Sequence, residues 1–216
     1  MNEDEATAEQ ARSAGPGTGA PHATSDETSA DDARAGSGTD APAAAGEALG
    51  EEMIRRARGY FSENYLPKIR AAVDRLPAED LWWRPNAASN SVGNLLLHLA
   101  GNVRQWVVAG LAGREDVRHR AAEFAADGGM EAGEVLERLE SALAEVDEAL
   151  AGLDPAALGE PRRVQGMKTT GLGALLHAVE HFSGHTGQIL WITKLRTGAE
   201  LGFYSESDDG TIATHW

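Results

Sequence analysis

Apolar side chains recur every three or four residues in four separate segments of this 216-residue chain. Such spacing lines them up on one face of an α-helix, and that face has to be buried against a partner. Helices are therefore predicted over residues 49–76, 91–111, 131–150 and 172–195. Pro67 lies inside the first of them and is expected to kink it. The pattern predicts an all-α fold, a four-helix bundle.

The connections after the second and third predicted helices are long, spanning residues 112–130 and 151–171. Tight antiparallel hairpins need only a few residues, so at least one connection is expected to cross the length of the bundle. Residues 163–167 look extended, but this piece is judged too short to build a sheet. No element is predicted for the polar tail 204–216, whose terminal Trp216 has no assigned role.

Residues 1–50 contain no aromatic residue, and ten acidic side chains stand against two basic ones. Such a segment cannot bury enough apolar surface to offset its ordering entropy. We therefore interpret residues 1–48 as a disordered acidic tail and residues 49–216 as one bundle domain. With no basic n-region and no apolar run, the tail is expected to be neither a signal peptide nor a membrane anchor.

Charge and composition exclude several classes of function. The net charge is −15 and the domain has no basic face, which disfavours nucleic-acid binding. No apolar run approaches the roughly 20 residues that cross a bilayer, so no membrane association is expected. The absence of cysteine leaves His, Asp and Glu as metal ligands and fits a cytoplasmic protein best.

Four histidines stand where a helix should present its core face. Three follow at four-residue intervals, and His98 lies alone in a run of leucines; the three are His177, His181 and His185. Residues four apart share a helix face about 6 Å apart, so either neighbouring pair could bind one ion, but not all three. His98 from another helix would complete a three-nitrogen site.

A lone histidine of this kind is more often a hydrogen-bonded core residue, but two helices carrying them together favour a metal site. Three protein ligands with open positions are typical of catalytic rather than structural zinc. Zinc is preferred, with nickel, iron and copper as alternatives for imidazole ligands. Asn94, Asn102 and Gln188 lie one turn from these histidines and could orient the rings or contact a ligand.

Two motifs resemble the DinB/YfiT-like superfamily over about residues 50–200. One runs from Asn90 to Asn102 around His98, and the other runs from His181 to Ile189. The segments 82–86 and 120–124 resemble one uncharacterised branch of that group.

The resemblance implies a four-helix bundle with a long crossover and a divalent metal on His98, His181 and His185. His177 then becomes a core residue or a support for the ligands. The resemblance also implies homodimers, and an S-transferase or isomerase activity with low-molecular-weight thiols such as bacillithiol or mycothiol. Asn94, Asn102, Gln188 and Arg84 are candidates to hold a polar small-molecule substrate or to orient the ligands.

Three hypotheses of function follow. The first is a metal-dependent enzyme with a thiol cosubstrate, and metal-dependent hydrolysis is a second enzymatic version of it. The next is a non-catalytic metal-binding module that acts in a stress response or senses a ligand. The last is a purely structural bundle whose histidines bond only to one another.

Overall fold

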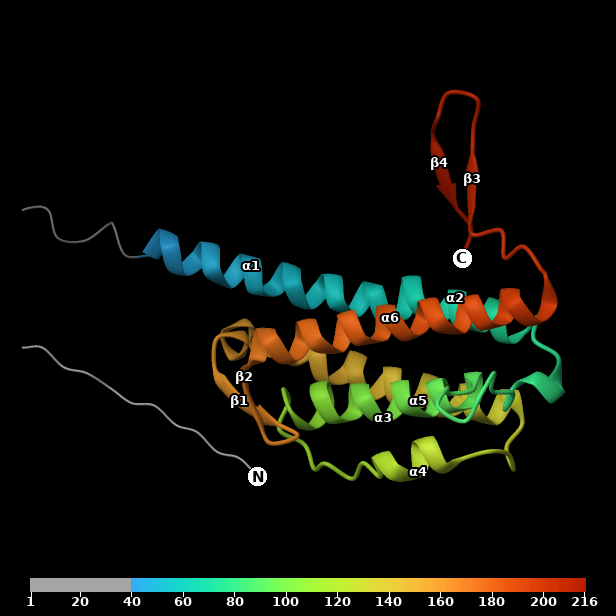
Figure 1. Cartoon of the computed structure of the whole chain (residues 1–216). Coiled ribbons are helices and arrows are strands. Elements are labelled where there is room, and N and C mark those ends of the chain that lie inside the picture. The colour runs from blue at the N-terminus through green and yellow to red at the C-terminus, as the bar shows by residue number, and fades with distance from the viewer. Residues whose placement is uncertain (1–39) are drawn as a thin grey trace, which may run out of the picture. The chain divides into compact units, whose positions relative to one another are not determined.

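The computed structural model describes residues 40–216, so most of the predicted disordered tail, residues 1–39, lies outside the described residues. Four long helical rods form the domain, as predicted (Figure 1). The first joins α1 (Asp40–Gly59), the π-helical η1 (Tyr60–Tyr65) and α2 (Leu66–Val73), and the second joins α3 (Val92–Val103) and the π-helical η3 (Arg104–Ala109). The third and fourth rods are α5 (Ala132–Ala151) and α6 (Gly171–Thr197).

The first rod begins at Asp40, earlier than the residue 49 expected from the apolar pattern. Its irregularity lies in η1, immediately before Pro67, which occupies the first turn of α2. Proline has no N–H to donate to the preceding turn, and a π-helical turn is a common way for a helix to absorb such a loss. The departure from regular α-helix expected at Pro67 is thus found one turn earlier.

Helix boundaries elsewhere agree with the capping signals in the sequence. Ser91 caps α3, accepting a hydrogen bond from the backbone N–H of Asn94, whose side chain accepts one from Ser91 in return. Thr170 caps α6 by accepting a hydrogen bond from the backbone N–H of Gly173 at 3.1 Å, and Gly198 ends the helix with a φ of 66°. These short polar caps satisfy backbone donors that the first helical turn leaves free.

A long connection runs the length of the bundle between α3 and α5, which lie side by side and point the same way (Figure 1). At one end, the indole N–H of Trp82, just before α3, donates to the carbonyl of Met130, just before α5, at 3.1 Å. We call residues 112–130 the strap; it contains the short helix α4 (Arg120–Ala125). The strap is the long crossover that the sequence predicted.

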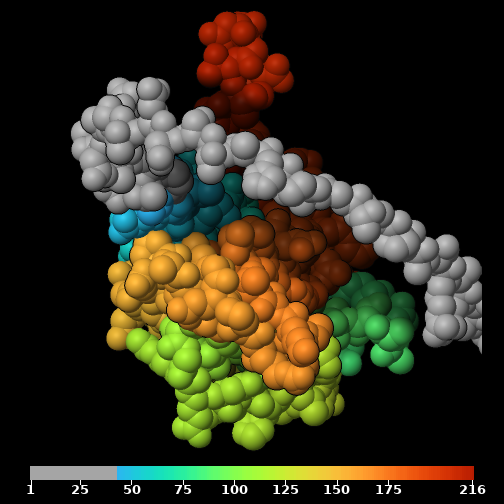
Figure 2. All heavy atoms as spheres, turned by 90° about the vertical axis from the view of Figure 1, so that its left-hand side faces the viewer, coloured from blue at the N-terminus to red at the C-terminus, as the bar shows by residue number. Residues whose placement is uncertain are grey.

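The connection between α5 and α6 stays at one end of the bundle. It contains η4 (Pro155–Leu158) and a two-stranded antiparallel sheet of β1 (Pro161–Val164) and β2 (Met167–Thr170). The expectation that this stretch was too short for a sheet was wrong, because Gln165 and Gly166, with φ of 51° and 79°, make a two-residue turn that pairs the flanking strands. Figure 2 looks onto this end, where the orange hairpin packs over the bundle.

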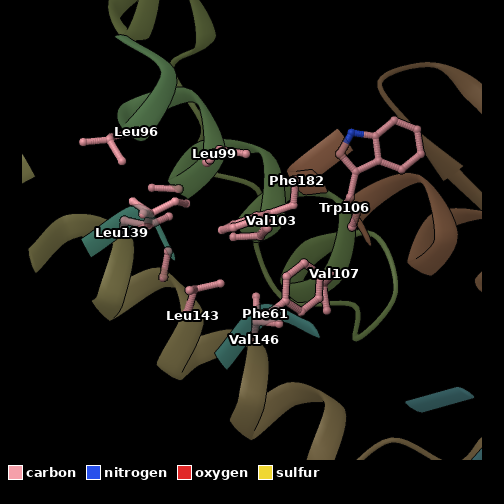
Figure 3. Packing of buried hydrophobic residues seen from close by; sticks show 14 of the residues in the cluster. Phe61, Leu96, Leu99, Val103, Trp106, Val107, Leu139, Leu143, Val146 and Phe182 are labelled. Atoms are coloured by element: carbon pink, nitrogen blue, oxygen red, sulfur yellow. The ribbon is translucent and has the colours of Figure 1, made fainter. Parts of the chain in front are cut away.

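The core lies between the four rods and is filled by aliphatic and aromatic side chains (Figure 3). Phe61 of η1 and Phe182 of α6 meet edge to face, with ring centroids 5.3 Å apart. The facing leucines and valines of α3 and α5 are fully or almost fully buried; they include Leu96, Leu99, Val103, Leu139, Leu143 and Val146. Burial of this apolar surface is the main source of the bundle's stability.

A second small hairpin follows α6, formed by β3 (Tyr204–Glu206) and β4 (Ile212–Thr214), where no element was predicted. The described residues also include the 3-10 turn η2 (Ala78–Asp80) before α3. Within residues 40–216, no helix combines the length and apolar character needed to cross a membrane.

Candidate metal centre

His98 lies on the inner face of α3 and is 4 % exposed. Because Ser91 sets the start of the helix, the ring falls two turns further along, facing α6. Its Nε2 atom lies 2.8 Å from Nε2 of His181, and its Nδ1 atom lies 2.9 Å from a carboxylate oxygen of Glu123. Both ring nitrogens therefore have polar partners in an otherwise apolar part of the bundle.

His181 and His185 lie one helical turn apart on α6 and turn their rings toward His98. The ring centroids of His181 and His185 are 4.4 Å apart and nearly perpendicular. One nitrogen from each of the three histidines lies within 4.8 Å of the others. The structure thus brings together the three histidines that the sequence predicted as ligands, and selects the later of the two possible pairs.

Gln188, also a predicted site residue, fixes the orientation of His185. Its side-chain oxygen accepts a hydrogen bond from Nδ1 of His185 at 2.6 Å. With the proton held on Nδ1, the lone pair of Nε2 is free to act as a ligand. This contact is the one that an orienting role for Gln188 requires.

The remaining predicted residues surround the histidine group without joining it. His177 stacks on Trp106, with ring centroids 3.8 Å apart, one turn before His181. The side chains of Asn94 and Arg84 both donate to the carbonyl oxygen of Ala126 in the strap, at 2.7 and 2.8 Å. They therefore hold the strap rather than face the three rings.

Asn102 lies one turn beyond His98 on α3 and is almost completely buried. Its side-chain oxygen has no hydrogen-bond partner among the described residues. A buried acceptor without a partner is costly, so this amide is a candidate contact for a water or a small ligand.

Two residues beside His98 were not singled out by the sequence. Glu123 binds the ring, and Arg118 binds both oxygens of Glu123, each at 2.7 Å. Glu123 lies in the segment 120–124, which resembles one branch of the superfamily but was given no role, and no pattern in the sequence marks Arg118. Their partner in α3 is distant in sequence, so only the path of the strap brings them to the site.

Burial keeps His181 and His185 neutral. Burial, reinforced by the nearby His185 and His98, lowers the pKa of His181 to about 3. Burial also lowers the pKa of His185, against the opposing effect of Gln188. A neutral imidazole is the form that binds a metal ion, so both rings are ready to do so at neutral pH.

For Glu123, hydrogen bonding rather than burial decides the direction of the pKa shift. Burial alone would raise its pKa, but the hydrogen bonds from Arg118 and His98 outweigh burial and hold the pKa below its usual value. The side chain is therefore a carboxylate at neutral pH, able only to accept hydrogen bonds.

A cavity of about 400 Å³ opens beside the histidines on the surface of α6. Gly184 lies in its lining, and no atom approaches the place where its side chain would be. A small molecule can therefore reach the rings from this side. The lining residues are His177, Glu180, His181, Gly184, His185 and Gln188.

The geometry of the three nitrogens suits a divalent ion. Bonds of 2.0–2.1 Å to a tetrahedral ion place two imidazole nitrogens about 3.4 Å apart. The observed group, with 2.8 Å between the rings of His98 and His181 and at most 4.8 Å across the set, reaches this by small ring rotations. Three neutral nitrogens that leave coordination positions open fit zinc, and also nickel or iron.

The fold and the site together define a helical bundle with a three-histidine group that could hold a metal ion. The family profile of the DinB superfamily matches residues 66–189, which is more than half of the chain. The chain therefore belongs to the DinB superfamily, as the resemblance predicted. The matched residues include all three histidines of the group.

Two solved structures show the same fold. A DinB-like protein from Bacillus subtilis, YjoA, is 16 % identical, with a TM-score of 0.50, and the match covers 67 % of this chain and 93 % of that one. A conserved protein from Enterococcus faecalis is 18 % identical, also with a TM-score of 0.50, and the match covers 70 % and 96 %. No curated protein matches the chain.

Proposed function

We propose that this protein is a metal-dependent enzyme that transfers a small thiol to an electrophile, with His98, His181 and His185 as the metal ligands. The observation that carries the proposal is the convergence of three nitrogens from two helices beside an open cavity. Zinc is the preferred metal, and nickel or iron are alternatives. A bound divalent ion supplies a Lewis acid that favours the thiolate form of a thiol at neutral pH.

The protein's own residues would hold the metal ion and orient its ligands. His181 and His185 remain neutral at neutral pH because they are buried, and Gln188 keeps the proton of His185 on Nδ1. Asn102 offers a buried amide oxygen one turn from His98. The chain contains no cysteine, so the nucleophilic sulfur has to come from a cosubstrate. In the transfer, a carbon–sulfur bond forms, the leaving group departs with its electron pair, and the thiol proton passes to solvent.

Full-length protein loaded with zinc or nickel tests the proposal directly. It is incubated with 1-chloro-2,4-dinitrobenzene and, in turn, cysteine, coenzyme A, bacillithiol and mycothiol. We expect faster conjugation with at least one thiol, and loss of that acceleration in His181→Gln. Equal rates with and without protein for every thiol and both metals would refute a transferase.

Metal-dependent hydrolysis is the second candidate, favoured by Glu180, the carboxylate in the lining of the same cavity. Its test is turnover of ester and amide substrates without added thiol, with Glu180→Gln as the control.

A non-catalytic module for stress response or ligand sensing is the remaining alternative. It predicts that the metal raises the melting temperature by binding linkage and that neither assay shows turnover.

We further propose that the protein is a cytoplasmic homodimer without nucleic-acid or membrane partners. Support for a dimer comes from three large apolar side chains on the outer face of α6 that are 47 %, 62 % and 54 % exposed: Leu176, Trp191 and Leu195. Apolar groups gathered on one helix face are typical of an interface with a second chain.

A further inference from the structure

We infer that Glu123 is a positioning residue for His98, and that Arg118 holds Glu123 in place for this purpose. The inference rests on the proposed metal-binding function. It gives the strap a function beyond connecting the rod of α3 to α5.

The carboxylate of Glu123 is engaged at both oxygens. Oε2 lies 2.9 Å from Nδ1 of His98, and Arg118 donates from Nε to Oε1 and from Nη2 to Oε2, both at 2.7 Å. The side chains of Arg118 and Glu123 are 2 % and 10 % exposed. A buried ion pair of this kind is weak evidence for stability, because desolvation opposes the attraction between the charges. A role in orienting the ring of His98 explains the buried pair of Arg118 and Glu123 better than a contribution to stability does.

The surface of α3 leaves room for this pair. Gly101 lies one turn after His98, and a side chain there would overlap the carboxylate of Glu123 and lie 2.9 Å from Nε of Arg118. Any residue with a Cβ atom would displace the carboxylate from the ring. The glycine is therefore explained by the approach of the strap, not by a turn of the helix.

The backbone of the strap is held by directed polar contacts near Glu123. Asn94 donates to the carbonyl of Glu123 at 2.9 Å and to that of Ala126 at 2.7 Å. Arg84 donates to the carbonyls of Phe124 and Ala126. Glu123 is the buried residue of α4, so the side of this helix that meets the bundle carries a carboxylate where an apolar side chain would normally pack.

Apolar side chains do not fill all of the space beneath the strap. A cavity of about 570 Å³ lies between the strap and the bundle, with Leu97 and Val108 on one side and Val117 and Met130 on the other. Hydrogen bonds that converge on the segment around Glu123 therefore help to place the strap, beside the contact of Phe124 with the ring of His98. Such an arrangement fixes the position of one side chain better than it stabilises the fold.

The consequence for His98 concerns which nitrogen carries the proton. A carboxylate only accepts and an arginine only donates, so Glu123 requires a proton on Nδ1 of His98. The lone pair then lies on Nε2, the atom that faces His181. Nη2 of Arg118 also lies 3.0 Å from Nδ1, and a ring that accepted this bond would carry its proton on Nε2 and could not bind a metal there. The charge of Glu123 selects the binding form.

Zinc affinity of the full-length protein, measured by competition with a chromogenic chelator, tests this role. Loss of such a supporting partner typically weakens metal binding by about 10- to 100-fold, and we expect this for Glu123→Gln. Glu115→Gln makes the same charge change at an exposed position of the strap and is expected to leave the affinity within about twofold. Gly101→Ala is expected to weaken binding as Glu123→Gln does, since it moves the carboxylate.

Glu123→Gln leaves Arg118 buried without its partner and could unfold the protein. The double variant Glu123→Gln with Arg118→Met removes both charges and the competing arginine donor; it is expected to fold and to bind zinc more weakly than the wild type, because the charged acceptor of the Nδ1 proton is lost. In the zinc-loaded wild type, proton–nitrogen correlation of the histidine rings is expected to show a proton on Nδ1 of His98 and the metal on Nε2.

The outcomes separate this inference from the proposed function. Wild-type zinc affinity retained in the folded double variant, or a proton found on Nε2 of His98 in the zinc-loaded wild type, would overturn the role of Glu123 alone. Failure of the wild type to bind any of the three metals would overturn both the role and the proposed function.

Discussion

The indole of Trp106 lies against the imidazole of His177, with ring centroids 3.8 Å apart and the planes inclined by 31°. This stacking places the first histidine of α6 against η3, and its ring also stacks on that of His181, with centroids 5.4 Å apart. It explains why three histidines at equal spacing on one helix are not equivalent. Two of them join the group that could hold a metal, and the third packs against an aromatic ring.

We therefore predict different effects from the same substitution at His177 and His181. His177→Gln is expected to change zinc affinity by less than about twofold, whereas His181→Gln removes one of three ligands and should weaken binding by more than about 100-fold. Isothermal titration of both variants with zinc measures the difference. Comparable losses at the two positions would show that His177 is a ligand.

The stability of the metal-free protein should depend on pH through His181. The folded pKa is about 3, below the value of about 6.5 for an unfolded histidine. Between these values the unfolded chain binds a proton that the folded protein excludes, so the free energy of unfolding falls as the pH falls from about 6.5 toward 3. Burial of His185 and His177 acts in the same direction.

Urea unfolding at pH 7.0, 5.5 and 4.5 in the presence of a chelator measures this dependence. His181→Gln removes the titrating group, so the loss of stability on acidification should be smaller than in the wild type. An identical loss in the two proteins would mean that His181 does not carry this part of the pH dependence.

The three-histidine group could be predicted in part because the relevant geometry is local, although that geometry left two pairs of histidines on the last helix open and only the family resemblance favoured the later pair. His181 and His185 share a face of one helix whatever the rest of the chain does, and the apolar surroundings of His98 mark it as buried. Ser91, Thr170 and Gly198 likewise signal helix ends through contacts within a few residues.

The support of the site could not be predicted in this way. Glu123 reaches His98 only because the strap runs along the bundle in one particular position. Hydrogen bonds from Asn94 and Arg84 to carbonyl oxygens of the strap help to set that position. The hairpin β1–β2 was missed for a different reason. Its turn uses a non-glycine residue, Gln165, at positive φ, so the usual turn signal is weak.

The proposed homodimer predicts an effect of Trp191, which is 62 % exposed on α6. Trp191→Glu is expected to convert the dimer to a monomer with unchanged far-ultraviolet circular dichroism, because a charge would be buried at the interface. Light scattering coupled to size exclusion gives the mass. Leu49→Glu, at an equally exposed position of α1, serves as the matched control and should leave the dimer intact. A monomeric wild type at micromolar concentration would refute the dimer.

Trp216 packs against the ammonium group of Lys68. Nζ of Lys68 lies 3.7 Å from the ring centroid of Trp216 and donates to the side chain of Asn64 at 2.8 Å. Lys68 is 9 % exposed, and an ammonium group over an indole at such a site contributes about 1 kcal/mol. Trp216→Ala should therefore lower the free energy of unfolding by about this amount, since it removes one of the partners of a nearly buried ammonium group.

Urea unfolding of Trp216→Ala, Lys68→Met and the double variant gives the coupling between the two side chains. Ile212→Ala, at an exposed position of β4 shortly before Trp216, should change stability by less than about 0.5 kcal/mol. Single-variant losses that simply add in the double variant would show that Lys68 and Trp216 do not interact. A coupling near 1 kcal/mol would instead give Trp216 the structural role that its position at the end of the chain does not suggest.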